Sequence, residues 1–154
     1  KIETDKKNIE IVNYLTKNKI NVVGHIGITP QKFNDFKKIR SVGKTIKEEK
    51  ALISLAINLE KAGAKFIILE CIKLNVARKI TRLLKIPTIG IGSSKYCDGQ
   101  VLVTNDMLNI DKNETKLRFV KKYSNINGVI KNAVKKFSKD VKNKKFPSKS
   151  FSYL

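Results

Sequence analysis

The chain has 154 residues, 41% of them apolar, which suffices for one modest core and argues against a two-domain enzyme. Its net charge of +20 comes from 33 basic and 13 acidic residues, but 29 of the basic residues are Lys and only 4 are Arg. Lys, Ile and Asn fill 63 positions, which indicates a coding bias towards A/T-rich codons. A nucleic-acid surface is expected to use the bidentate Arg fork, so the charge does not predict nucleic-acid binding.

Cysteine usage and hydropathy argue against zinc-binding, disulfide-rich, membrane-spanning and secreted proteins. Cys71 and Cys97 form no CxxC motif and have no His cluster nearby, so we predict neither a zinc site nor a disulfide framework. No apolar run approaches the roughly 18 residues of a spanning helix, and no secretory signal opens the chain. We expect a cytoplasmic protein that binds no membrane. Because the pattern places Lys1 at the end of an apolar strand, we also expect a fragment of a longer protein.

The first predicted elements are a helix and a strand. Thr4 or Asp5 can cap a helix that ends near Asn18. Its predicted buried face carries Ile11, Tyr14 and Leu15. A strand is expected over residues 20–24.

The clearest helix begins at a capping box, in which Thr45 is followed three residues later by Glu48. Gly63 predicts its end. The apolar run at 66–69 is too short for a helix and predicts a strand buried on both faces. The residues that share the apolar face of this helix are Leu52, Leu55, Ala56 and Leu59.

The remaining pattern repeats strand and helix. A helix follows with apolar residues at 76, 80, 83 and 84, then strands over 88–91 and 101–103. A last amphipathic helix carries apolar residues at 130, 134, 137 and 141, and a Lys-rich tail covers 142–154. This alternation predicts an α/β fold with parallel strands, either a doubly wound sheet or a (β/α)₈ barrel.

Both folds bind ligands at the carboxyl ends of their strands, so polar residues that follow a strand are the candidates. His25 fits a catalytic group or a hydrogen-bonded loop residue. Glu70 ends an apolar run, where a desolvated carboxylate suits a general base, although a structural role is equally open. Gly90 and Gly92 allow either a ligand or a packed neighbour to come close. The basic residues at 37, 38, 40 and 44 belong to a mobile lid or, more simply, to a solvated loop.

A series of motifs resembles one family. The segment Gly24-His25-Ile26-Gly27-Ile28-Thr29-Pro30-Gln31 is similar to the signature of the ketopantoate hydroxymethyltransferases. Three further blocks, at 59–71, 86–92 and 97–108, resemble the same family in order and spacing. The likeness extends over nearly the whole chain, to about Tyr123.

The resemblance implies a (β/α)₈ TIM barrel, of which this chain is the C-terminal half from the end of strand 4 onward. Residues 1–141 then form the half barrel with its terminal helix. By the same resemblance Glu70 is the catalytic base, Lys1 and His25 bind the substrate, and Glu3 ligates Mg²⁺. The separations of 24 positions from Lys1 to His25 and 45 from His25 to Glu70 agree with the family. Two metal-binding aspartates would lie upstream.

The implied reaction is the transfer of a hydroxymethyl group from 5,10-methylenetetrahydrofolate to 3-methyl-2-oxobutanoate, which gives ketopantoate for pantothenate biosynthesis. The family also implies a homo-oligomer, with a decamer as the precedent. Glycines of the family pattern are replaced here at positions 4–5, 37–38 and 94, Ser93 stands where Ala is usual, and Asn105 stands where His is usual. A Cβ at a former glycine is expected to narrow the pocket or strain a loop.

Three alternatives remain at this point. One is another magnesium-dependent keto-acid barrel of the phosphoenolpyruvate mutase and isocitrate lyase type, whose lyase branch needs a Lys-x-x-Cys-Gly-His loop that this sequence lacks. The second is a basic nucleic-acid-binding protein, whose affinity would fall steeply with salt. The third is a truncated, inactive product, because an open half barrel exposes two sheet edges and is expected to be unstable alone.

Overall fold

The computed structural model describes residues 1–29, 40–111 and 117–153. The described residues divide into two compact units, the first built from residues 1–29, 40–102 and 117–119, the second from 103–111 and 120–153. No helix in the described ranges combines the length and the apolar character needed to cross a membrane. The predicted lid residues Lys37 and Lys38 lie outside the described residues.

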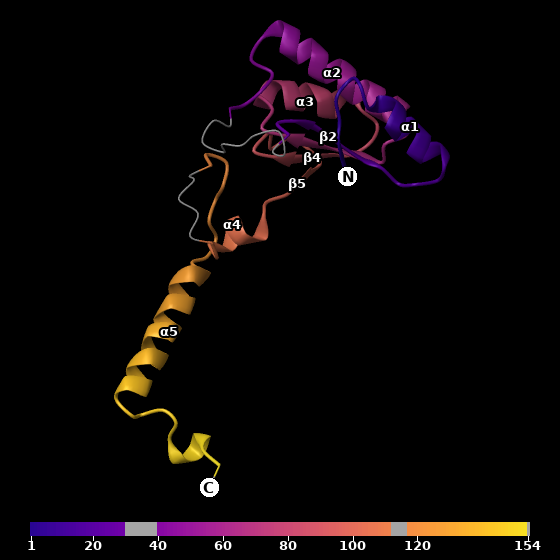
Figure 1. Ribbon diagram of the computed structural model, residues 1–154. Coiled ribbons are helices and arrows are strands. Elements are labelled where there is room, and N and C mark those ends of the chain that lie inside the picture. Colours follow the sequence, from indigo (N-terminus) through magenta and orange to yellow (C-terminus); the bar gives the residue numbers. More distant parts are fainter. Residues whose placement is uncertain (30–39, 112–116, 154) are drawn as a thin grey trace. The chain divides into compact units, whose positions relative to one another are not determined.

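The first unit is built on a sheet of five parallel strands in chain order (Figure 1). Each crossover from β1 to β4 contains a helix, as the alternating pattern predicts. The parallel α/β class is therefore confirmed. The strands are β1 (Ile2–Glu3), β2 (Val23–Gly27), β3 (Phe66–Glu70), β4 (Thr88–Ile91) and β5 (Gly99–Gln100).

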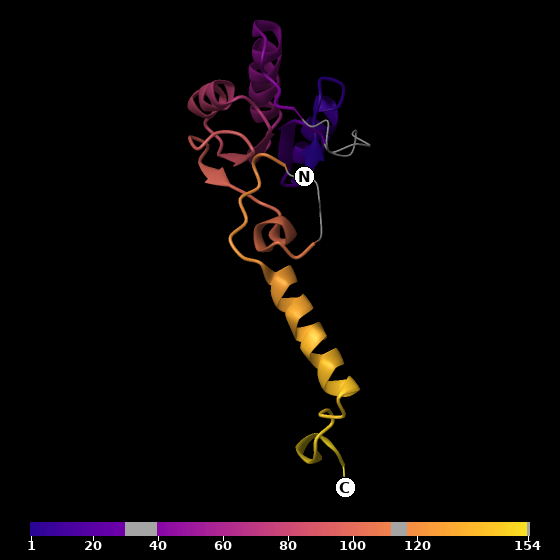
Figure 2. The ribbon, with the colours of Figure 1, turned by 90° about the vertical axis from the view of Figure 1, so that its left-hand side faces the viewer.

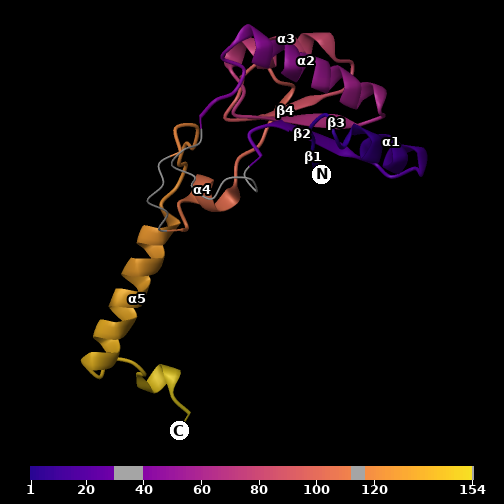
Figure 3. The same cartoon turned by 45° about the horizontal axis from the view of Figure 1, so that its top comes forward.

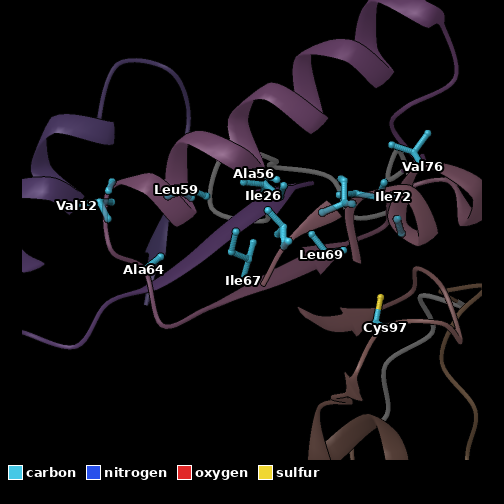
Figure 4. Packing of buried hydrophobic residues seen from close by; sticks show 14 of the residues in the cluster. Val12, Ile26, Ala56, Leu59, Ala64, Ile67, Leu69, Ile72, Val76 and Cys97 are labelled. Atoms are coloured by element: carbon cyan, nitrogen blue, oxygen red, sulfur yellow. The ribbon is translucent and has the colours of Figure 1, made fainter. Parts of the chain in front are cut away.

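Three helices accompany this sheet: α1 (Ile9–Lys17), α2 (Ile46–Lys61) and α3 (Leu74–Leu83). Figure 3 shows α2 and α3 over the same face of the sheet. The core lies between this face and the helices, as the labelled side chains in Figure 4 show. Its fully buried members include Val12, Ile26, Leu59, Ile67, Leu69 and Ile80.

Both ends of α2 match the sequence prediction. The Thr45 hydroxyl accepts a hydrogen bond from the Glu48 amide at 3.2 Å, which satisfies one free donor of the first turn. The Glu48 carboxylate accepts hydrogen bonds from the backbone amides of Lys44 and Gly43. These hydrogen bonds lower the pKa of Glu48, and the one from Lys44 has the largest effect. At the other end Gly63 takes a positive φ of 90° and closes the helix.

The predicted start of α1 is wrong, and of the three residues predicted to share its apolar face only Leu15 packs against the core. The helix begins after Asn8, and neither Thr4 nor Asp5 caps it: the Thr4 hydroxyl donates to the Ile2 carbonyl. Val12 is the fully buried residue, whereas 54% of Ile11 and 68% of Tyr14 are exposed. The buried face is the one that packs towards α2, and the Thr16 hydroxyl fixes it by donating to the Ala62 carbonyl at 2.6 Å.

Two strand boundaries also differ from the prediction. Strand β2 starts at Val23 instead of residue 20, so His25 lies inside the strand and not after it. Ile20 belongs to the end of α1, because its amide donates to the Leu15 carbonyl. The last strand is Gly99–Gln100 instead of 101–103, because Val103 already precedes the first turn of the next helix.

The second unit contains α4 (Thr104–Leu108), α5 (Ile126–Lys142) and a 3₁₀ turn, η3 (Lys149–Phe151), seen in Figure 2. The Asn125 side chain caps α5 by accepting the Gly128 amide at 3.2 Å, and the Asn109 side chain donates to Asn125. The final amphipathic helix is thus confirmed. Its apolar residues Ile130, Val134, Phe137 and Val141 are exposed.

Candidate functional site

Strand alternation places three of the predicted site residues on one face of the sheet. The register pairs Glu3 with His25 and His25 with Ile68, and Glu70 follows two positions after Ile68. These side chains therefore share the face opposite α2, while Ile67 and Leu69 point into the core. Since all five strands run the same way, Glu3 and Glu70 both end their strands at the same edge of the sheet.

His25 and Glu70 meet on this face. The His25 Nε2 atom lies 3.0 Å from the Glu70 Oε2 atom, with 0% of the imidazole and 11% of the carboxylate side chain exposed. Despite this short distance, the carboxylate is not placed in the direction that a hydrogen bond from a ring N–H requires. Neither ring nitrogen has another hydrogen-bond partner among the described residues. A fully buried imidazole with a carboxylate neighbour but no regular hydrogen bond among the described residues is unusual, since buried polar atoms are normally hydrogen-bonded. The pair can therefore accept a further polar group.

The backbone on both sides of Glu70 is tied to neighbouring strands. The Glu70 carbonyl accepts the Ile28 amide at 3.0 Å, and the Cys71 amide donates to the Ile91 carbonyl at 2.9 Å. Gly27 makes the first contact possible: its φ is 108°, and an added Cβ would stand 2.1 Å from the Glu70 carbonyl oxygen. This role of Gly27 was not predicted from the sequence, although the second glycine of the Gly-His-Ile-Gly motif was the available signal.

Cys71 directly follows β3 in a left-handed conformation, with φ at 52°, which non-glycine residues adopt rarely. The adjoining loop is paired to it, since the Cys71 carbonyl accepts the Val42 amide at 2.9 Å. Burial, with a further contribution from the Glu70 carboxylate, raises the pKa of the Cys71 thiol to about 11. The thiol is therefore protonated at neutral pH, which suits a packing role and not a nucleophile.

Glu3 and Lys1 stand at the first strand of the same sheet. The Glu3 carboxylate is half-buried and has no hydrogen bond or ion pair within the described residues, so its oxygens are available to a hard cation. The strand is held beside His25 by the Thr4 amide, which donates to the His25 carbonyl at 2.8 Å. Lys1 is exposed. Across the described residues no three acidic, His or Cys side chains gather closely enough to hold a metal ion.

Gly90, within β4, and Gly92, directly after it, serve packing. A Cβ at Gly90 would stand 2.9 Å from the Gln100 side chain. Gly92 has φ of 60°, and its Cβ would stand 2.7 Å from the ring of Phe119. Of the two interpretations of this pair, the structure supports close packing. Ser94, which follows, is buried, and its hydroxyl accepts the Tyr96 amide.

A cavity of about 300 Å³ adjoins the carboxyl end of β2. Gly27, Val42 and Leu52 contribute to its wall, but His25 and Glu70 do not. The paired carboxylate and imidazole therefore face a different space from this cavity, on the other side of the sheet.

Comparison with known proteins finds one matching family model and several relatives that share one enzyme name. Residues 1–149 match the model of the family described as ketopantoate hydroxymethyltransferase. A protein of Pelagibacter ubique (strain HTCC1062), named 3-methyl-2-oxobutanoate hydroxymethyltransferase, is 49% identical over 153 residues, which are 99% of this chain and 58% of the relative. Proteins with the same name from Buchnera aphidicola subsp. Schizaphis graminum (strain Sg) and Saccharolobus islandicus (strain L.S.2.15 / Lassen #1) are 45% and 43% identical, and the chain covers 58% and 55% of them.

The chain spans a little more than half the length of these curated relatives, while nearly all of its own residues align with them. The family match covers the strands that carry Glu3, His25 and Glu70. The chain belongs to the ketopantoate hydroxymethyltransferase family.

Proposed function

We propose that this chain supplies the part of a (β/α)₈ barrel from the end of its fourth strand onward, with residues 1–141 in the barrel and 142–154 as a tail. Two observations support this arrangement. The five parallel strands follow one another in chain order, with helices packed against one face, as in one side of such a barrel. The relatives are longer than this chain, and their additional residues are enough to form the remaining strands of a barrel.

We infer that the complete barrel transfers a hydroxymethyl group from 5,10-methylenetetrahydrofolate to 3-methyl-2-oxobutanoate. The approach of Glu70 to His25, at 3.0 Å on a largely buried face, is the observation that carries this proposal. Glu70 accepts the proton from the carbon next to the keto group, and the C–H electron pair passes into an enolate. Water adds to the folate methylene carbon as both of its carbon–nitrogen bonds break, so that the bond electrons and the two water protons pass to the nitrogens and formaldehyde is released. The enolate carbon then bonds to the formaldehyde carbon, and the former water oxygen takes up the proton from Glu70 to become the product hydroxyl.

His25 and Lys1 have positioning roles in this proposal. A ring nitrogen of His25 holds an oxygen of the substrate or an ordered water, because a buried imidazole that lacks a regular hydrogen bond gains most from a new one. The Lys1 ammonium group pairs with the substrate carboxylate, a contact that needs only a flexible point charge.

Glu3 provides one anionic ligand for Mg²⁺, which when bound would polarise the keto oxygen as a Lewis acid. Replacing Glu3 by Gln removes the ligand charge and keeps its shape. We expect a complete enzyme carrying Glu3→Gln to need a higher Mg²⁺ concentration for half-maximal activity, with an unchanged circular dichroism spectrum. An unaltered Mg²⁺ dependence would exclude Glu3 as a ligand.

The general-base role is tested by comparing two isosteric substitutions. Glu70→Gln cannot accept a proton, so kcat for ketopantoate formation should fall by about 10²–10⁴ while the keto acid still binds. The control is Glu49→Gln, which changes a carboxylate on α2 that pairs with Lys79. We expect kcat of the control to match the parent. A kcat for Glu70→Gln within a few-fold of the control would refute the assignment.

A further inference from the structure

A second cavity, of about 530 Å³, lies at the end of the sheet remote from His25 and Glu70. It forms where α1 and α2 end and where β2 and β3 are about to begin. Four lysines contribute to its wall, together with Asn13 and Asn21. We call this space the lysine cavity, after Lys17, Lys19, Lys61 and Lys65.

No acidic side chain in the described part of the chain balances the charge of the lysine cavity. None of its described lining residues is acidic, and none of the four lysines forms an ion pair within the described residues. Elsewhere on the same unit such a pair does form, between Lys79 and Glu49 at 2.5 Å. Lys17 and Lys61 lie in the last turns of α1 and α2, where they complement the helix dipoles. Each helix end carries roughly half a negative charge, so the two ends offset about one of the four positive charges.

The size and side-chain types of the cavity favour a small multivalent anion. Its volume lies within the roughly 300–1,000 Å³ range of small-molecule sites. Ammonium groups bind phosphate oxygens as point charges, and the amides of Asn13 and Asn21 add uncharged donors. No Arg lines the cavity, so the bidentate contacts typical of a nucleic-acid surface are lacking among the described lining residues.

We propose that the lysine cavity binds a soluble anion with two or three linked phosphate groups. Each phosphate brings more than one negative charge at neutral pH, so such an ion can offset the roughly three positive charges that the helix ends leave uncompensated. The site is separate from the face of Glu3, His25 and Glu70, and it does not depend on the proposed reaction.

The test is to titrate the protein and its variants with inorganic triphosphate at low ionic strength and to measure the dissociation constant by calorimetry. The variant Lys19→Gln/Lys65→Gln removes two cavity charges that lie outside the helices. Its matched control is Lys144→Gln/Lys145→Gln, which removes the same net charge in the second unit. Lys19 and Lys144 both follow a helix with positive φ, of 62° and 53°, so the backbone context is matched as well.

We expect the cavity variant to weaken triphosphate binding roughly five- to thirty-fold and the control to change it by less than about twofold. Equal weakening in both variants would mean attraction to net charge alone and would overturn the proposal. A duplex DNA that binds more tightly than triphosphate, and loses most of its affinity in the cavity variant, would assign the site to nucleic acid instead. If the cavity variant fails to fold, the single variant Lys65→Gln must still weaken triphosphate binding. Lys65→Arg, which keeps the positive charge, must then bind triphosphate like the parent.

Discussion

Gly27 offers the sharpest link between backbone geometry and the proposed chemistry. Gly27→Ala places a Cβ that would stand 2.1 Å from the Glu70 carbonyl oxygen, on a residue whose φ is 108°. That φ is strained for an L-residue, at about 1–3 kcal/mol. To restore an ordinary contact the end of β3 must move by about 1 Å, and an error of this size at a reacting group costs about 10² in rate.

Gly99→Ala is the matched control, because its added Cβ meets only Ile89 Cγ1 at 3.6 Å and its backbone is unstrained. The assays are urea unfolding and enolisation of the keto acid in the complete enzyme. We expect Gly27→Ala to lose about 1–3 kcal/mol and about 10²-fold in enolisation rate, and Gly99→Ala to change neither quantity much. Equal behaviour of the two variants would refute the claim that Gly27 places Glu70.

Three further predictions concern stability. The thiol pKa of Cys71 is raised from 9.0 to about 11, so its contribution to folding is complete below pH 9 and is lost as the pH rises towards 11. Urea unfolding should therefore show that the parent loses about 2 kcal/mol more stability than Cys71→Ala between pH 9 and pH 11, and parallel pH profiles would contradict this. Thr45→Ala removes the N-cap of α2, so chemical denaturation should show a free energy of unfolding that is lower by about 1 kcal/mol. An unchanged free energy of unfolding would mean that the cap does not stabilise the fold. Leu59→Ala empties a fully buried position and should cost about 2–5 kcal/mol, against little for Leu83→Ala, which is 56% exposed; similar losses would contradict the described core.

The two helix ends near the lysine cavity show what local sequence signals can and cannot predict. Helices α1 and α2 both close with the same pair of backbone hydrogen bonds around a residue of positive φ. At α2 that residue is Gly63, so the end was predictable. At α1 it is Lys19, which gives no such signal, and Ile20 was therefore predicted as a strand residue.

The candidate site could be anticipated only in part from the residues themselves. The apolar run of β3 predicted that Glu70 ends a buried strand, and the structure agrees. The meeting of Glu70 with His25 depends on the register between β2 and β3, which no local pattern specifies. The contact between Gly27 and the Glu70 carbonyl depends on that same register.

Deuterium exchange into 3-methyl-2-oxobutanoate tests the role of Glu70 as the base most directly. In heavy water, with Mg²⁺ and without folate, exchange at the carbon next to the keto group reports proton removal alone and not carbon–carbon bond formation. We predict that in the complete enzyme Glu70→Gln slows exchange by about 10²–10⁴, while His25→Asn, which removes a positioning group, slows it less. Exchange at the parent rate in Glu70→Gln would contradict the proposed mechanism and assign the proton to another base.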